Sequence, residues 1–85
     1  MIKFETVKKG SKGQCVSILQ AILRCMQYTG ADGKPLEVTG TCNNNTVYAI
    51  NKFQEVQRAY GVELGTNGKS DSSFGPKCWN RLLGV

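Results

Sequence analysis

The chain has 85 residues and a formal net charge of +5, with 40% hydrophobic and 20% charged residues. A chain of this length forms one domain, residues 1–85. It buries only roughly 60–65% of its unfolded surface, which leaves little room for an enzyme cleft. There is no histidine, so a histidine-based triad or zinc site is excluded. No apolar run approaches the ~20 residues of a membrane span, and we do not expect the opening Met1-Ile2-Lys3-Phe4-Glu5 to be a signal peptide. We therefore expect a soluble protein that is not an enzyme and has no cofactor.

The four cysteines, Cys15, Cys25, Cys42 and Cys78, allow two disulfides in three connectivities. A bond between Cys15 and Cys25 is excluded, because both fall on the first predicted helix about 15 Å apart. No pair has C-x-x-C spacing, and no two are close enough in sequence to suggest a metal site. We expect four free, buried thiols and no metal. Two disulfides, as in a secreted effector, remain the alternative.

The first predicted helix covers residues 13–27. Ser11 and Gln14 have the spacing of a capping box, which predicts that Ser11 accepts from an amide of the first turn. The apolar residues fill one half of the circumference, with Gln20 beside their edge: Cys15, Val16, Ile18, Leu19, Ile22, Leu23 and Met26. Three lysines precede the helix, at a position where the helix dipole disfavours cations: Lys8, Lys9 and Lys12. They form either a solvated arm or an anion contact.

The central predicted helix, residues 44–60, organises the rest of the chain. Its apolar arc contains Ala49, Ile50, Phe53, Val56 and Tyr60. Gln54 and Gln57 lie on the same arc, where a side-chain amide needs hydrogen-bond partners. We expect Gln54, and also Gln20 on the first helix, to be structural residues that hold loop backbone.

A third helix is predicted over residues 76–83, starting after Gly75 with Pro76 at its first position and burying Trp79 in the core. The two connecting loops are rich in glycine. The first has turn pairs at Asp32-Gly33 and Thr39-Gly40 and a short extended piece at 36–38; the second contains the hairpin-type pair Asn67-Gly68. The predicted fold is an all-α, small three-helix bundle with two long loops.

Residues 39–50 and 71–82 share one pattern at an offset of 32 residues, without an identical position. In each segment a turn pair is followed by an apolar residue, three mostly small or turn-forming residues, and the start of a helix. The chain therefore contains a pseudo-repeat of loop-helix units.

Three motifs, arriving in order over a core of about residues 8–83, resemble the peptidoglycan-binding domain of the type 1 family. The first is Lys9-Gly10-Ser11-Lys12-Gly13-Gln14-Cys15-Val16, followed by Leu19-Gln20 and Leu23. The second is Thr39-Gly40-Thr41-Cys42-Asn43-Asn44-Asn45-Thr46, followed by Ala49-Ile50 and Phe53-Gln54. The third is Asp71 to Trp79, followed by Leu82-Leu83.

The resemblance implies a non-catalytic module that binds bacterial cell-wall peptidoglycan and anchors an associated cell-wall hydrolase or other exported enzyme. It implies an extracellular location at the wall, reached as part of a larger chain or by phage lysis. We expect a monomer with no membrane span and no specific nucleic-acid partner.

Residues at the two loop-to-helix junctions suit a ligand rich in hydroxyls, amides and carboxylates. We expect ligand contacts from Asn43, Asn44, Tyr48, Asp71 and Lys77. Each of these also has a plainer interpretation as a helix cap or surface residue. The alternative function is a small basic helical DNA-binding module, since three helices with a basic charge can form a helix-turn-helix.

Overall fold

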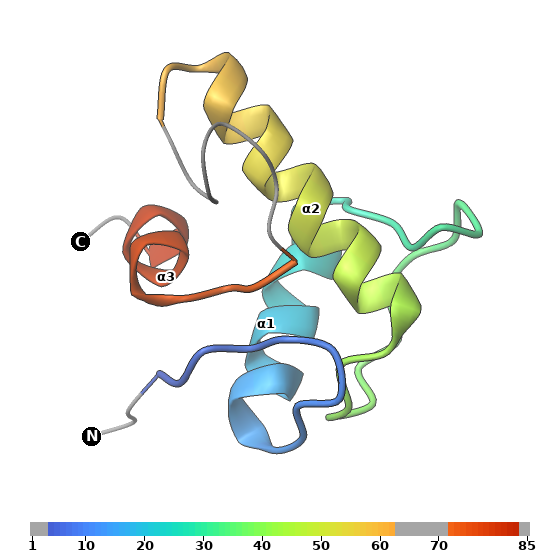
Figure 1. The fold of residues 1–85 in the computed structure, drawn as a ribbon. Helices are drawn as coiled ribbons and strands as arrows, with labels where there is room; N and C mark the ends of the chain where they lie inside the picture. The colour runs from blue at the N-terminus through green and yellow to red at the C-terminus, as the bar shows by residue number, and fades with distance from the viewer. Residues whose placement is uncertain (1–3, 63–71, 84–85) are drawn as a thin grey trace.

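The computed structural model describes residues 4–62 and 72–83, which form three helices (Figure 1). Helix α1 covers Gln14–Cys25, α2 covers Asn44–Ala59 and α3 covers Pro76–Leu83. Within these residues the chain forms isolated β-bridges but no strand. The predicted all-α, three-helix fold is therefore confirmed. The predicted turn at Asn67-Gly68 and the predicted ligand residue Asp71 lie outside the described residues. Among the helices of the described residues, none has the length and hydrophobicity of a membrane span.

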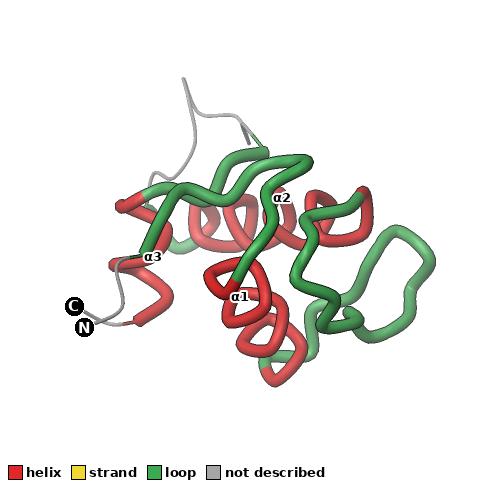
Figure 2. Tube along the Cα trace, turned by 90° about the horizontal axis from the view of Figure 1, so that it is seen from below, coloured by secondary structure: helices red, strands yellow, loops and turns green. Residues whose placement is uncertain are grey.

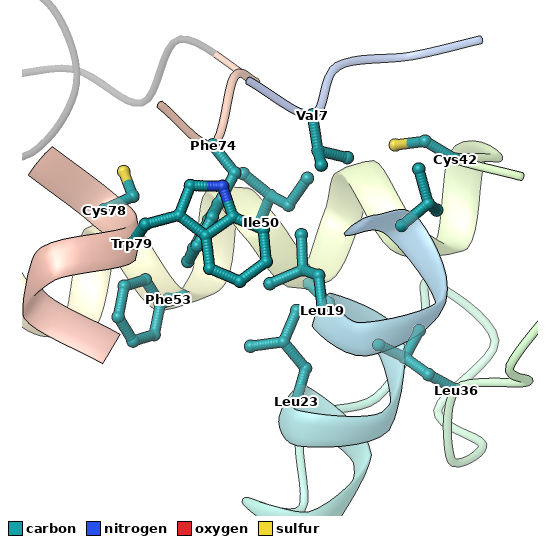
Figure 3. Close-up of a cluster of buried hydrophobic side chains, with 12 residues drawn as sticks. Val7, Leu19, Leu23, Leu36, Cys42, Ile50, Phe53, Phe74, Cys78 and Trp79 are labelled. Carbon is teal, nitrogen blue, oxygen red and sulfur yellow. The ribbon is translucent and has the colours of Figure 1, made fainter. Parts of the chain in front are cut away.

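Helix α2 packs against α1 and α3 around one core (Figure 1, Figure 3). Aromatic rings link the second loop to the helices: Phe74 lies 5.4 Å from Phe53 and 5.0 Å from Trp79 between ring centroids. Trp79 is only 2% exposed, and its Nε1 donates to the Glu5 carbonyl oxygen at 2.9 Å. Because the loops contribute side chains to the core along with the helices, the stability of the bundle depends on the contacts that hold the loops in place.

The segment before α1 pairs with both connecting loops. Val7 and Phe74 exchange backbone hydrogen bonds at 3.0 and 2.7 Å. Farther along, the Gly10 amide donates to the Cys42 carbonyl oxygen at 2.9 Å, and the Cys42 amide donates to that of Ser11 at 2.8 Å. These contacts fix the two loops against the same N-terminal segment.

The predicted capping box at Ser11 is wrong. The N-cap of α1 is Gly13, without a side-chain cap, and the Ser11 Oγ accepts from the Lys8 amide at 3.0 Å instead. Ser11 and Gly13 are both bound to the first loop through their backbones, Gly13 by a 2.9 Å bond to the Gly40 carbonyl oxygen. The chain therefore runs along the loop here and does not fold Ser11 over the helix start.

Two residues assigned to apolar arcs are exposed: Met26 at 47% and Tyr60 at 75%. Both are C-caps, of α1 and α2 respectively, so the helical periodicity that placed them on the core side has ended there. The extended piece expected at 36–38 forms no strand either, and the bridge nearby joins Thr29 to Pro35.

None of the four cysteines forms a disulfide, as expected, but not all are buried. Cys42 and Cys78 are buried, Cys15 is half-buried and Cys25 is exposed. The expectation of burial is therefore wrong for Cys25, which lies in the last turn of α1.

Candidate binding pocket

The first loop is tied to α1 by the buried amide of Gln20. Its Oε1 accepts from the amides of Thr39 and Gly40 at 2.9 and 3.0 Å. Its Nε2 donates to the Thr41 carbonyl oxygen at 3.0 Å and to the Thr46 Oγ1 at 2.9 Å. Gln20 therefore joins α1, the end of the loop and the first turn of α2.

Gln54 has the same role one unit later in the chain. Its Nε2 donates to the Ser73 carbonyl oxygen at 2.7 Å and lies 3.5 Å from the Cys78 Sγ. Ser73 and Cys78 lie 32 residues after Thr41 and Thr46, the corresponding partners of Gln20. The pseudo-repeat is thus a repeated hydrogen-bonding arrangement, in which a buried glutamine of one helix holds the loop before the next.

Two asparagines fix the start of α2. Asn43, the N-cap, accepts through Oδ1 from the Thr46 amide at 3.0 Å and from the Thr46 hydroxyl at 3.1 Å. The Asn45 Oδ1 accepts from the Ala31 amide at 3.1 Å and so binds the first loop to the helix. Gly30 is buried beside Asn45, and a Cβ at this position would lie 2.5 Å from the Asn45 Cγ. Only glycine allows this close approach.

The first loop contains a tight turn at residues 30–34. The Gly30 amide donates to the Lys34 carbonyl oxygen at 3.1 Å, and the Lys34 amide donates to the Asp32 Oδ1 at 3.0 Å. Gly33 has a φ of 76°, so the turn predicted at Asp32-Gly33 is present. After the turn, the Leu36 side chain is buried in the core. The Nη1 of Arg24 on α1 donates to the Leu36 carbonyl oxygen at 3.3 Å.

A pocket of about 130 Å³ opens between this turn and the first turn of α2. It is lined by Gly30, Asp32, Lys34, Pro35, Leu36, Glu37, Asn43, Asn45 and Thr46. In Figure 1 and Figure 2 the loop that forms one wall extends to one side of the helices. The lining offers two carboxylates, one ammonium and two amide side chains, a set that suits hydrogen bonding to a polar ligand.

The structure places the predicted ligand residues in different positions. Asn43 lines the pocket. Asn44 and Tyr48 are exposed one turn apart on α2, outside the lining, and Tyr48 is 44% exposed. Lys77 is exposed on α3, which lies across the fold from the start of α2 (Figure 1). Asp71 lies outside the described residues.

Five polar residues of the pocket were not among the ligand contacts predicted from the sequence: Asp32, Lys34, Glu37, Asn45 and Thr46. The sequence pattern indicates Asp32 only as a turn former and Asn45 only as part of a helix start. The sequence carries one signal for these residues, a concentration of polar and turn-forming residues just before the Asn-rich start of the central helix. This signal indicates a loop, but it does not show which part of the helix the loop packs against.

In the part of the chain that the structure describes, no group of three or more cysteine or acidic side chains is placed to hold a metal. Burial raises the pKa of the Cys42 thiol, and burial together with the nearby Tyr60 raises the pKa of the Tyr28 phenol. Neither group lines the pocket.

Comparison with protein-family models, with curated proteins and with solved structures gave no match. The likeness to peptidoglycan-binding domains therefore rests on the three sequence motifs.

Proposed function

We propose that this chain binds bacterial cell-wall peptidoglycan without cleaving it and anchors an associated cell-wall hydrolase or other exported enzyme. The observation that carries the proposal is the polar pocket, because it lies beside the second motif. Asn43, Asn45 and Thr46 belong to that motif and line the pocket. Peptidoglycan presents hydroxyls, amides and carboxylates, which side chains of this kind can bind.

The surface next to the pocket extends the candidate contact area along α2. Asn44 and Tyr48 are four residues apart and therefore neighbours on one face of the helix. Tyr48 is 44% exposed and does not belong to the hydrophobic core cluster. A tyrosine ring offers both an apolar face and a hydroxyl to a sugar. A glycan strand lying along α2 would then reach the pocket with a side group.

The direct test is a pull-down of the purified chain with insoluble sacculi, run beside duplex DNA and an unrelated protein of similar basic charge. Retention that survives moderate salt supports the proposal, because nonspecific attraction between exposed charges is screened at distances beyond about 8–10 Å at physiological salt. Retention that disappears with salt, or that the basic control matches, contradicts it. Tight binding to DNA alone would favour the helix-turn-helix alternative.

Two tyrosines of α2 and its C-cap provide a matched pair of variants. We expect Tyr48→Ala to reduce retention on sacculi and Tyr60→Ala to leave it unchanged, because Tyr60 is 75% exposed at the opposite end of the helix. Equal retention of both variants would remove Tyr48 from the binding surface.

A further inference from the structure

We infer that the pocket between the 30–34 turn and α2 binds a zwitterionic group, an ammonium and a carboxylate carried by one small ligand moiety. The inference rests on the proposed function. The glycan carries no such group, and a stem peptide of peptidoglycan supplies it only through a side chain with a free amino-acid end, because the amino group of a residue within the peptide chain is acylated and uncharged. The inference assigns the specificity of the pocket to residues absent from the sequence-based site, chiefly Lys34 and Glu37.

Charges of both signs line the pocket without neutralising one another. Asp32 and Lys34 come from the turn and Glu37 from the segment that follows it. Among the described residues an ion pair is found between Lys52 and Glu55, and none joins the charged groups of the pocket. Asp32 uses Oδ1 to accept from the Lys34 amide, which leaves its second oxygen for a ligand. Both an anion-binding and a cation-binding group therefore remain available.

The asparagines add hydrogen-bond donors to the same pocket. Asn43 and Asn45 each use Oδ1 to accept from protein amides, which fixes the orientation of both side-chain amides. Within the described chain neither Nδ2 has a partner. These two NH₂ groups and the Lys34 ammonium can donate to a carboxylate, while the carboxylates of Asp32 and Glu37 can accept from an ammonium.

The size of the pocket limits what enters it. A volume of about 130 Å³ is below the ~300–1,000 Å³ of pockets that enclose drug-sized ligands, so one small group fits and a disaccharide does not. A neutral polar group can hydrogen-bond to these side chains but leaves their charges uncompensated, and charge-assisted hydrogen bonds are roughly twice as strong as neutral ones. A lone anion would meet two carboxylates, and a lone cation would meet Lys34. A zwitterion satisfies both signs.

The test is a titration of the ¹⁵N-labelled full chain with four probes, followed by NMR. D-alanine carries both charges, N-acetyl-D-alanine only the carboxylate, D-alanine methyl ester only the ammonium, and N-acetylglucosamine neither. We expect D-alanine to shift the amide signals of Gly30, Ala31 and Asn45. Its affinity should be at least about tenfold higher than that of either singly charged analogue, because each loses one set of charge-assisted hydrogen bonds.

Charge-matched variants localise the effect. Lys34→Met removes the ammonium but keeps the backbone bonds of the turn, and we expect it to weaken D-alanine binding at least about tenfold. Lys12→Met makes the same change at an exposed residue that does not line the pocket, and affinity should not change. Glu37→Gln and Glu55→Gln form the corresponding acidic pair.

The outcomes separate this inference from the proposed function. If sacculi are retained but N-acetylglucosamine shifts the pocket signals as strongly as D-alanine, or no probe shifts them, the zwitterion assignment is overturned and peptidoglycan binding stands. If D-alanine binds in the pocket but sacculi are not retained, the pocket chemistry stands and the proposed function is overturned. Loss of D-alanine binding in Lys12→Met as well as Lys34→Met would also overturn the assignment to this pocket.

Discussion

At the scale of single residues, the two buried glutamines set the positions of the loops. Replacing Gln54 by Leu removes the donor to the Ser73 carbonyl oxygen, and we expect the free energy of unfolding to fall by about 1–3 kcal/mol. Gln20→Leu should cost more, because the amides of Thr39 and Gly40 both lose their acceptor. Urea denaturation measures both effects, with Gln14→Leu as the exposed control. An unchanged midpoint for Gln54→Leu would show that the amide is not structural.

At Gly30 the loop lies close against Asn45 of α2. In Gly30→Ala the new Cβ would overlap the Asn45 side chain, so we expect a loss of about 1–3 kcal/mol and displacement of Asn45 from the pocket. Gly75→Ala is the control, because the nearest atom to its Cβ would be 3.7 Å away, an ordinary contact. The stability of each variant and the NMR shift of the Ala31 amide test this. A Gly30→Ala protein as stable as Gly75→Ala would mean that the loop can move aside at no cost.

The sequence predicts a contact when the pattern that causes the contact lies within one helix. The contacts of Gln20 and Gln54 follow from an amide placed on or beside an apolar arc, a pattern within one helix. The pocket role of Lys34 and Glu37 could not be predicted, because it depends on the path of the loop after Gly30 and on its docking against Asn45. No hydrophobic periodicity in the sequence indicates the path of this loop.

At the scale of elements, the segment before α1 is part of the core. Val7 is 1% exposed, and its backbone is hydrogen-bonded to that of Phe74. This segment therefore packs in the core and holds the end of the second loop. We expect Val7→Ala to lower the free energy of unfolding by about 1.5–3 kcal/mol, because it removes two buried methyl groups. Val38→Ala, at 49% exposure, should have almost no effect. Similar thermal midpoints for the two variants would show that the N-terminal segment does not contribute to the folded core.

The helices could be predicted because their signals lie within each element. Predicted spans of 13–27, 44–60 and 76–83 compare with Gln14–Cys25, Asn44–Ala59 and Pro76–Leu83 in the structure. The ends of the helices are harder to predict. Ser11 does not cap α1, because its backbone is hydrogen-bonded to Lys8 and to Cys42, and Cys42 lies far along the chain in the first loop. The N-terminal segment was not predicted to be structural, because its partners lie in two loops far along the chain.

At the scale of the whole molecule, burial changes the ionisation of groups that have no part in the pocket. The pKa of the Cys42 thiol is raised above its ordinary value of 9.0 by burial. The pKa of the Tyr28 phenol is raised above 10.0, mainly by burial and further by Tyr60. Both groups are neutral when protonated, so the folded chain holds these protons to higher pH than the unfolded chain does.

Stability should therefore fall at alkaline pH. Above about pH 9 the unfolded chain releases the Cys42 proton while the folded chain retains it, which favours unfolding, and above about pH 10 Tyr28 adds to the effect. Below pH 8 neither group makes stability depend on pH. Urea midpoints measured from pH 7 to 10.5 should show this decline. Cys42→Ala should flatten its first part whatever its effect on overall stability, whereas Cys25→Ala, at the exposed thiol, should not. An identical decline in all three proteins would show that the buried thiol does not control it.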